Sequence, residues 1–135
     1  MKTVILNLTQ HAATPELLKA GVVDLSERKL SELRVLLTFD NIPSAAELKD
    51  RAEKIERLAV SFLCEITPEN ELLDDVDLAA MIGGAPFFMA TLESHLKERA
   101  IRPLYAFSRR DSVEVAAPEG VVKQAVFRHL GFYEA

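Results

Sequence analysis

Three short polar segments of this sequence each follow an apolar run and carry groups suited to binding an anion. They are Thr9, Gln10 and His11; Gly83, Gly84 and Ala85; and Ser108, Arg109, Arg110 and Ser112. Hydroxyl, amide and guanidinium groups donate hydrogen bonds to phosphate, and glycine lets the backbone approach a ligand closely. If the apolar runs are parallel strands of one sheet, all three segments lie at the same edge of it. The sequence therefore predicts a phosphate-binding sheet edge.

The paired glycines mark the strongest candidate for the anion itself. Gly83 and Gly84 separate an apolar run from Pro86, which suits the first turn of a helix. Free N–H groups and the helix dipole then favour negative charge, but contribute only about 0.3 to 2 kcal/mol. The glycine spacing is neither a dinucleotide fingerprint nor a Walker A loop. A purely structural turn that packs the helix on the sheet stays open.

Two of the segments also carry candidates for catalysis. His11 is a candidate proton carrier, because histidine changes protonation near neutral pH, and Arg109 would stabilise charge on a phosphate. Thr9 and Gln10 would contact a ribose or phosphate, unless they only form the turn before the next helix. The alternative for the arginines is a solvated hairpin on which they pair with nearby carboxylates.

Composition limits the other classes of function. The chain has 135 residues, a formal charge of −5 and 49% hydrophobic residues, which predicts a single acidic globular domain over 1–135. We expect no long nucleic acid as partner, because the net charge is negative. No signal-like or membrane-spanning run is found, so a cytoplasmic location and no membrane partner are expected. Cys64 is the only cysteine, and no histidine or acidic cluster has metal-ligand spacing, so we expect no disulfide, metal or cofactor.

The elements that would position the three segments follow from periodicity and capping residues. Apolar runs predict strands at 3–8, 78–82 and 103–107, and Val121 to Phe132 returns from a turn at Pro118 to Gly120 as an antiparallel strand. Helices are predicted from Pro15 to Gly21, after caps at Ser26 and Ser44, and after the paired glycines. The segment 65–77 reads as a surface connection. This order predicts an α/β fold, a three-layer Rossmann-like arrangement with a mostly parallel sheet and a C-terminal antiparallel hairpin.

The pattern resembles the small CRISPR-associated Rossmann-fold (CARF) proteins, including compact ring nucleases. The resemblance is carried by Val4 to His11 followed by Thr14-Pro15-Glu16, and by Met81 to Pro86 leading through a helix to Leu104-Tyr105-Ala106-Phe107-Ser108. It implies a homodimer that places a cyclic oligoadenylate across its two-fold axis. It further implies cleavage without metal, by attack of a ribose 2′-hydroxyl on the adjacent phosphate. By position, Thr9 to His11 would meet ribose or phosphate, Gly84 and Ala85 would donate N–H groups, and Ser108 to Arg110 would clamp phosphate.

Two other classes of function stay open at this point. A non-enzymatic interaction protein of a phage or mobile element would use the hairpin or the acidic segment to bind another protein, since strand addition at a hairpin edge is a known mode. An enzyme acting on another phosphorylated metabolite would use the same anion site.

Overall fold

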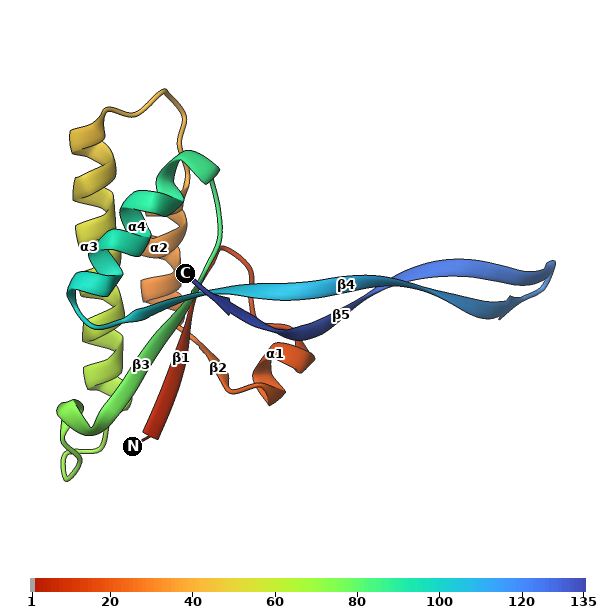
Figure 1. Ribbon diagram of the computed structural model, residues 1–135, viewed down its shortest axis with the longest axis horizontal. Coiled ribbons are helices and arrows are strands. Elements are labelled where there is room, and N and C mark those ends of the chain that lie inside the picture. The colour runs from red at the N-terminus through yellow and green to blue at the C-terminus, as the bar shows by residue number, and fades with distance from the viewer. Residues whose placement is uncertain (1) are drawn as a thin grey trace.

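The computed structural model describes residues 2–135 and shows an α/β fold built on one five-stranded sheet of order β2-β1-β3-β4-β5 (Figure 1). The predicted fold class, a mostly parallel sheet with a C-terminal antiparallel hairpin, is confirmed. The elements are β1 (Lys2–Leu8), α1 (Pro15–Lys19), β2 (Val22–Asp24), α2 (Glu27–Leu37), α3 (Ala45–Ile66), a 3₁₀ turn η1 (Leu73–Asp75), β3 (Val76–Ile82), α4 (Pro86–Glu98), β4 (Arg102–Ala117) and β5 (Gly120–Glu134).

The helices begin at capping residues that the sequence displays. The Thr14 hydroxyl accepts a hydrogen bond from Leu17 N–H at 3.3 Å, and the Ser44 hydroxyl accepts one from Glu47 N–H at 3.1 Å. Ser26 precedes α2, as predicted, but its side chain makes no capping hydrogen bond with the described residues. Helices α2, α3 and α4 gather on one side of the sheet, and the short α1 lies on the other side (Figure 1).

Parallel pairing brings two predicted strand ends together. β1 pairs with β3 in parallel from Lys2 and Val76 to Leu8 and Ile82, so the two strands end at the same level of the sheet. β3 pairs with β4 in parallel only at Arg102, Pro103 and Leu104 of β4. One hydrophobic cluster joins β1, β3 and the three larger helices, with Leu6 and Phe88 fully buried in it.

One strand was missed by the prediction, and the end of another was predicted wrongly. The three-residue β2 was not predicted, because it is too short to show alternation and depends on its pairing with β1. The third strand does not end at residue 107. β4 runs to Ala117, so Ser108 to Ser112 lie inside a strand and not at a strand end. The apolar run does stop near residue 107, but antiparallel pairing with β5 continues the strand through polar residues.

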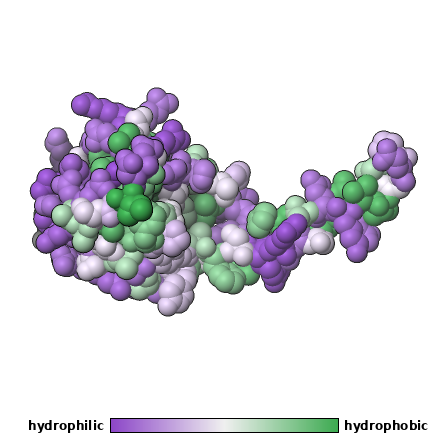
Figure 2. All heavy atoms as spheres, turned by 90° about the horizontal axis from the view of Figure 1, so that it is seen from above, coloured by the Kyte–Doolittle hydropathy of each residue, from purple (hydrophilic) through white to green (hydrophobic). Residues whose placement is uncertain are grey.

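Beyond Leu104, β4 has only β5 as a neighbouring strand, and the two strands project from the rest of the molecule (Figure 1). We call residues 107–130 the arm and the other described residues the body. A register shift between Phe107 and Ser108 leaves Leu130 as an extra residue where the arm leaves the body. Figure 2 shows the arm as a narrow extension that carries apolar as well as polar side chains. Among the described residues, no helix is both long and apolar enough to cross a membrane.

Candidate functional site

Two of the three predicted polar segments line one pocket at the carboxyl edge of the sheet. The pocket has a volume of about 490 Å³. Its lining includes all six residues predicted there: Thr9, Gln10, His11, Gly83, Gly84 and Ala85. Apolar walls come from β3, α1 and α2, and Tyr105 and Ala106 of β4 complete it. The two segments are more than 70 positions apart in the sequence, and the parallel pairing of β1 with β3 brings them to the same edge of the sheet.

The loop after β1 is held in place by the buried side chain of Asn7. Its amide donates to the His11 carbonyl at 2.7 Å and to Asp24 Oδ1 at 2.8 Å. Its carbonyl oxygen accepts from Thr9 N–H at 3.0 Å and from the Thr9 hydroxyl at 2.6 Å. Asn7 therefore satisfies both ends of its amide while fixing the loop that carries Gln10 and His11.

Sequence reasoning placed Asn7 at this strand end but gave it no role. Asn7 is only 2% exposed to solvent. A polar side chain buried to this extent needs hydrogen-bond partners, and this marks Asn7 as a positioning residue. The same contacts limit Thr9, because its hydroxyl proton already goes to Asn7 and its oxygen is left to accept. Asp24 adds a second anchor by accepting from Ala13 N–H at 3.1 Å.

The turn between β3 and α4 supplies backbone groups at the other side of the pocket. Gly84 has φ of +149°, a conformation that L side chains rarely adopt, and a Cβ there would meet Met89 and Leu37. Helix α4 starts at Pro86 without a side-chain cap. Phe88 N–H donates to the Ala85 carbonyl at 3.0 Å, and Phe87 N–H has no partner among the described residues. The helix start thus keeps donor capacity for an anion.

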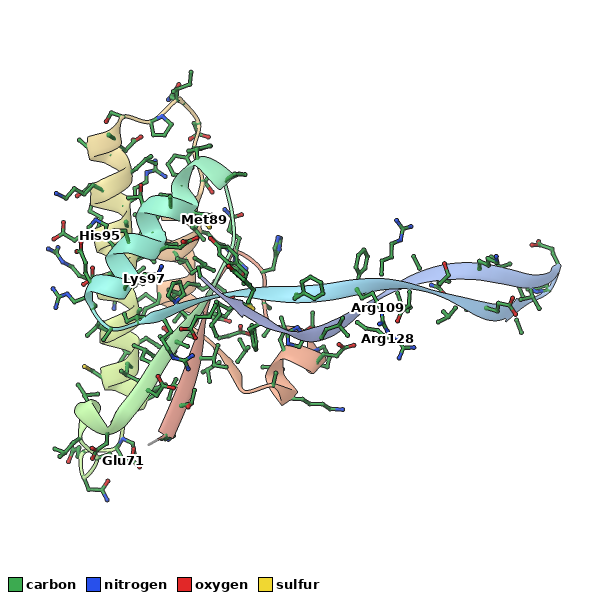
Figure 3. All side chains as sticks on the ribbon, viewed as in Figure 1. Glu71, Met89, His95, Lys97, Arg109 and Arg128 are labelled. Carbon is green, nitrogen blue, oxygen red and sulfur yellow. The ribbon has the colours of Figure 1, made fainter. Side chains whose placement is uncertain are left out.

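The third predicted segment does not reach this pocket in the same chain. Ser108, Arg109, Arg110 and Ser112 lie on the arm, and Figure 3 shows Arg109 and Arg128 there, away from Met89 in the first turns of α4. Arg109 Nε lies 2.8 Å from Asp111 Oδ1, and Arg128 Nε lies 3.0 Å from Asp111 Oδ2. Arg109 therefore follows the alternative of pairing with a nearby carboxylate.

The pocket lining contains no lysine or arginine among the described residues. The nearest cation that the contacts identify is Arg34 of α2, whose Nε donates to the Gln10 carbonyl at 3.2 Å. Sequence reasoning missed Arg34, since nothing in its helix distinguishes it from other surface cations. The prediction that all three polar segments meet at one site was therefore wrong: two of them line the pocket, and the segment with Arg109 and Arg110 lies on the arm.

Tyr105 forms one wall of the pocket, although the sequence predicted it only as part of a strand. Its hydroxyl donates to Glu93 Oε2 of α4 at 2.5 Å. Burial, followed by this hydrogen bond and the negative charge of Glu93, raises the pKa of the Tyr105 phenol well above its usual range. Through this hydrogen bond Tyr105 ties the start of β4 to α4 beside the pocket.

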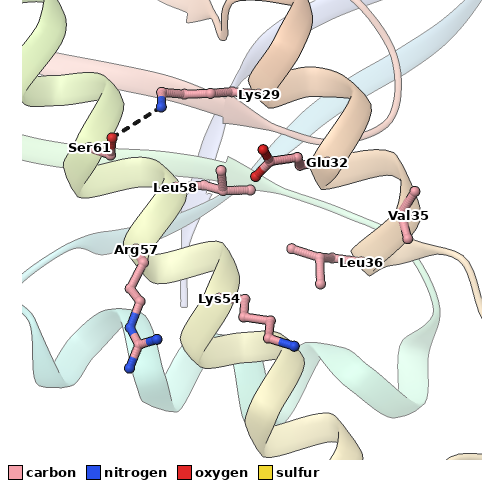
Figure 4. A pocket seen from close by; sticks show the side chains of 8 residues that line it. All are labelled: Lys29, Glu32, Val35, Leu36, Lys54, Arg57, Leu58 and Ser61. Atoms are coloured by element: carbon pink, nitrogen blue, oxygen red, sulfur yellow. Dashed lines mark hydrogen bonds between the residues drawn. The ribbon is translucent and has the colours of Figure 1, made fainter.

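A second concavity lies between α2 and α3 (Figure 4). It is a groove of about 540 Å³, and its apolar floor is formed by Val35, Leu36 and Leu58. Its three cations are already engaged: Lys29 with Glu65 at 3.0 Å, Lys54 with Asp50 at 2.9 Å, and Arg57 with Glu53 at 2.7 Å. This groove lies away from the strand ends and offers no free cation to a ligand within the described part of the chain.

Comparison with known protein families assigns the chain to one of them. A family model described as "Uncharacterized protein MJ1673 family" matches residues 3–133. The chain belongs to this family. Neither a curated protein nor a solved structure matches it significantly. The match to the MJ1673 family spans the pocket-forming body and runs through the arm, so both regions fall within the family's extent.

Proposed function

We propose that the pocket at the carboxyl edge binds a phosphate-bearing nucleotide. The observation that carries the proposal is the convergence of Thr9 to His11 with Gly83 to Ala85 around the start of α4. Backbone N–H groups at a helix start bind phosphate, and the loop after β1 presents an amide and an imidazole to the rest of the ligand. The volume of about 490 Å³ falls in the range of small-molecule sites.

The ligand to test first is a cyclic oligoadenylate, held by a homodimer in the cytoplasm. In the proposed reaction a ribose 2′-oxygen forms a bond to the adjacent phosphorus, and the bond from phosphorus to the 5′-oxygen breaks. His11 takes the proton of the attacking hydroxyl or returns one to the leaving oxygen. The chain's part is to hold the 2′-oxygen in line with the leaving group and to stabilise the phosphate charge.

Binding and cleavage are tested with cyclic tri-, tetra- and hexa-adenylate, each with and without EDTA. We expect saturable binding, and products that still form in EDTA. His11→Ala should lower the rate and leave binding near that of the wild type; unchanged turnover would remove His11 as the proton carrier. Neither binding nor product with any of the three rings would reject the cyclic oligoadenylate, and binding of a mononucleotide would then favour another phosphorylated metabolite.

A pocket-filling variant tests the location of the site. A Cβ at Gly83 would lie 3.6 Å from Thr9 Cγ2, so Gly83→Val extends a side chain toward Thr9 between the two segments without a backbone penalty. We expect it to weaken binding at least tenfold. Ala90→Val, on the exposed side of α4, places the same valine side chain outside the pocket and should bind like the wild type. Equal affinity for the two variants would place the ligand elsewhere.

A second function, interaction with another protein, is favoured by one observation, the bare arm. β4 has 16 residues and β5 has 15, and the parts of these strands that form the arm pair with no other strand of the sheet. This possibility concerns a different surface from the pocket.

A further inference from the structure

The arm lacks the neighbours that a long two-stranded ribbon needs. Isolated hairpins are marginally stable in water, and three or more strands or a covering helix are normally required. Several large apolar side chains of the arm are nevertheless exposed, at 41% to 69%: Phe107, Val115, Val121, Val122, Phe127 and Leu130. Exposed apolar side chains in a contiguous ribbon mark an interaction surface.

The edge of β5 is open toward the tip of the arm. Natural proteins protect long edge strands with inward charges, prolines or covering elements. Here the root is covered, because Glu16 of α1 accepts a hydrogen bond from His129 N–H at 2.7 Å. From Gly120 to Phe127 no other element covers the edge among the described residues, and Lys123 is the single charged residue of that stretch. The outer half of this edge is therefore open, and so is the other edge of the arm, because β4 pairs with β3 only as far as Leu104 and has no strand partner on that side at Ser108.

Charge favours an acidic partner, and the chain's own body is acidic. The arm holds four basic residues (Arg109, Arg110, Lys123 and Arg128) and three acidic ones (Asp111, Glu114 and Glu119). The whole chain has a net charge of −5, so all of its negative excess comes from outside the arm. A weakly positive arm and a negative body attract each other between two copies of the chain.

The position of the arm connects this attraction to the pocket. Ala106 lines the pocket, and Ser108 and Arg110 follow it along β4 at about 3.3 Å per residue. A two-fold axis that crosses two arms at Ser108 would set Arg110 of one copy beside Ala106 of the other, because each lies two residues from Ser108. Arg110 has no ion pair with the described residues, whereas the pocket lacks a lining cation.

We propose that each arm docks on a second copy of this chain and delivers Arg110 to that copy's pocket. The docking stands on the arm alone; the role of Arg110 rests on the proposed binding of phosphate. The resulting contact is isologous, so the two arms and the two pockets are completed together. The predicted phosphate clamp, Ser108 to Arg110, is thereby brought to the pocket by the partner.

Oligomeric state tests the docking without any ligand. The wild-type chain should run as a dimer by light scattering, and Val121→Glu with Phe127→Glu should give a monomer with unchanged circular dichroism of the body. Ile42→Glu, at a body position that is 99% exposed, is the matched control and should remain dimeric. A monomeric wild type, or a dimer that survives the double substitution, would overturn the docking.

Cross-linking tests the placement and does not depend on the stability of the arm variants. In a Cys64→Ser background, chains carrying Arg110→Cys are mixed with chains carrying Ala106→Cys, so any disulfide between the two is intermolecular. The mixed disulfide should form readily under mild oxidation. Leu72→Cys, exposed at the opposite edge of the sheet, replaces Ala106→Cys as the control and should not react. Equal yields for both pairs would contradict the crossing at Ser108.

Ligand binding separates the two proposals. Arg110→Ala should weaken the affinity for cyclic tetra-adenylate at least tenfold, and Lys123→Ala, a cation farther out on the arm, less than twofold. Wild-type binding that Arg110→Ala leaves intact overturns the delivery of Arg110 and keeps the pocket. A cross-linked dimer that binds no nucleotide keeps the docking and rejects the proposed function.

Discussion

The body and the arm belong to one sheet but follow different physical rules. In the body, β1 and β3 are covered on both sides, and Leu6, Ala79 and Ala80 are fully buried. In the arm, which β4 and β5 form alone, no residue is buried, and large apolar side chains are exposed on the same two strands as charged ones. Stability of the fold therefore comes from the body. The arm is a surface built from backbone pairing, and its side chains are free to serve contacts with other molecules.

The largest expected difference in stability is between the alanine variants of two phenylalanines, one in the body and one in the arm. Phe88 is fully buried in the core cluster, and Phe127 is 69% exposed on the arm. Phe88→Ala should lower the free energy of unfolding by about 3 to 5 kcal/mol, because it removes buried surface and leaves a cavity. Phe127→Ala should change it by less than about 0.5 kcal/mol in the monomer.

Urea denaturation at low protein concentration measures both variants. A large loss for Phe127→Ala under these conditions would mean that the arm packs on its own body. Phe127 would then contribute to the stability of the fold, as the core residues do.

The next effect concerns a polar residue that is buried in the body. Asn7→Ala removes the amide that joins Thr9, His11 and Asp24. The Thr9 N–H and the Asp24 carboxylate then lose a partner in a partly buried place, which should cost about 2 to 3 kcal/mol. Ligand affinity should fall as well, since the loop that carries His11 is released. Thr3→Ala, which removes an exposed hydrogen bond to Asp77, is the control for a polar contact of small worth. Equal losses of stability for the two variants would show that Asn7 does not anchor the loop.

The same contrast explains how much of the fold the sequence predicts. Body helices show caps such as Thr14 and Ser44 and a regular apolar period, so their existence follows from local rules. β2 and the length of β4 depend on pairing between distant segments, which local composition does not contain. The polar residues 108–112 thus read as a strand end although they continue the strand.

The candidate site also contains residues that strand ends predict and residues that they do not. Gly83 to Ala85 and Thr9 to His11 were predicted to meet because parallel strands end together, and they line one pocket. Arg109 and Arg110 were predicted to join them through a strand end that does not exist. The anchors Asn7, Asp24 and Arg34 act through hydrogen bonds to particular loop atoms, and spacing along the chain carries no sign of those bonds.

Alanine substitutions at the two neighbouring glycines of the pocket should have smaller effects on stability, and these effects should differ from each other. Gly84→Ala should cost about 1 to 2 kcal/mol, because its φ of +149° is unfavourable for any L side chain. Gly83→Ala should be close to neutral, since its Cβ would make an ordinary contact with Thr9 at 3.6 Å. Thermal unfolding compares the two variants. Equal losses would show that the turn relaxes and that its conformation is not fixed by the pocket.

The smallest effect lies in the body at the start of β4, where Arg102 joins three strands. Its guanidinium donates to both carboxylate oxygens of Asp77 on β3, at 3.0 and 2.8 Å, and to Glu134 of β5 at 2.5 Å. The hydrogen bonds from Arg102 hold the pKa of Asp77 below its ordinary value of 3.8. A carboxylate with a lowered pKa in the folded state stabilises the protein above the unfolded pKa and loses that contribution as the pH falls through the folded one.

Arg102→Gln should therefore raise the pKa of Asp77, as followed by the carboxyl carbon shift in an NMR titration. It should also flatten the dependence of stability on pH below about pH 4. The change in stability near pH 7 should be small, because the carboxylates are partly exposed to solvent and screened. If the body ends of β4 and β5 are held together only through this arginine, amide exchange in β5 near Glu134 should accelerate in the variant, while exchange in the buried strands β1 and β3 stays unchanged. Acceleration in all strands would mean that body and arm unfold as one unit.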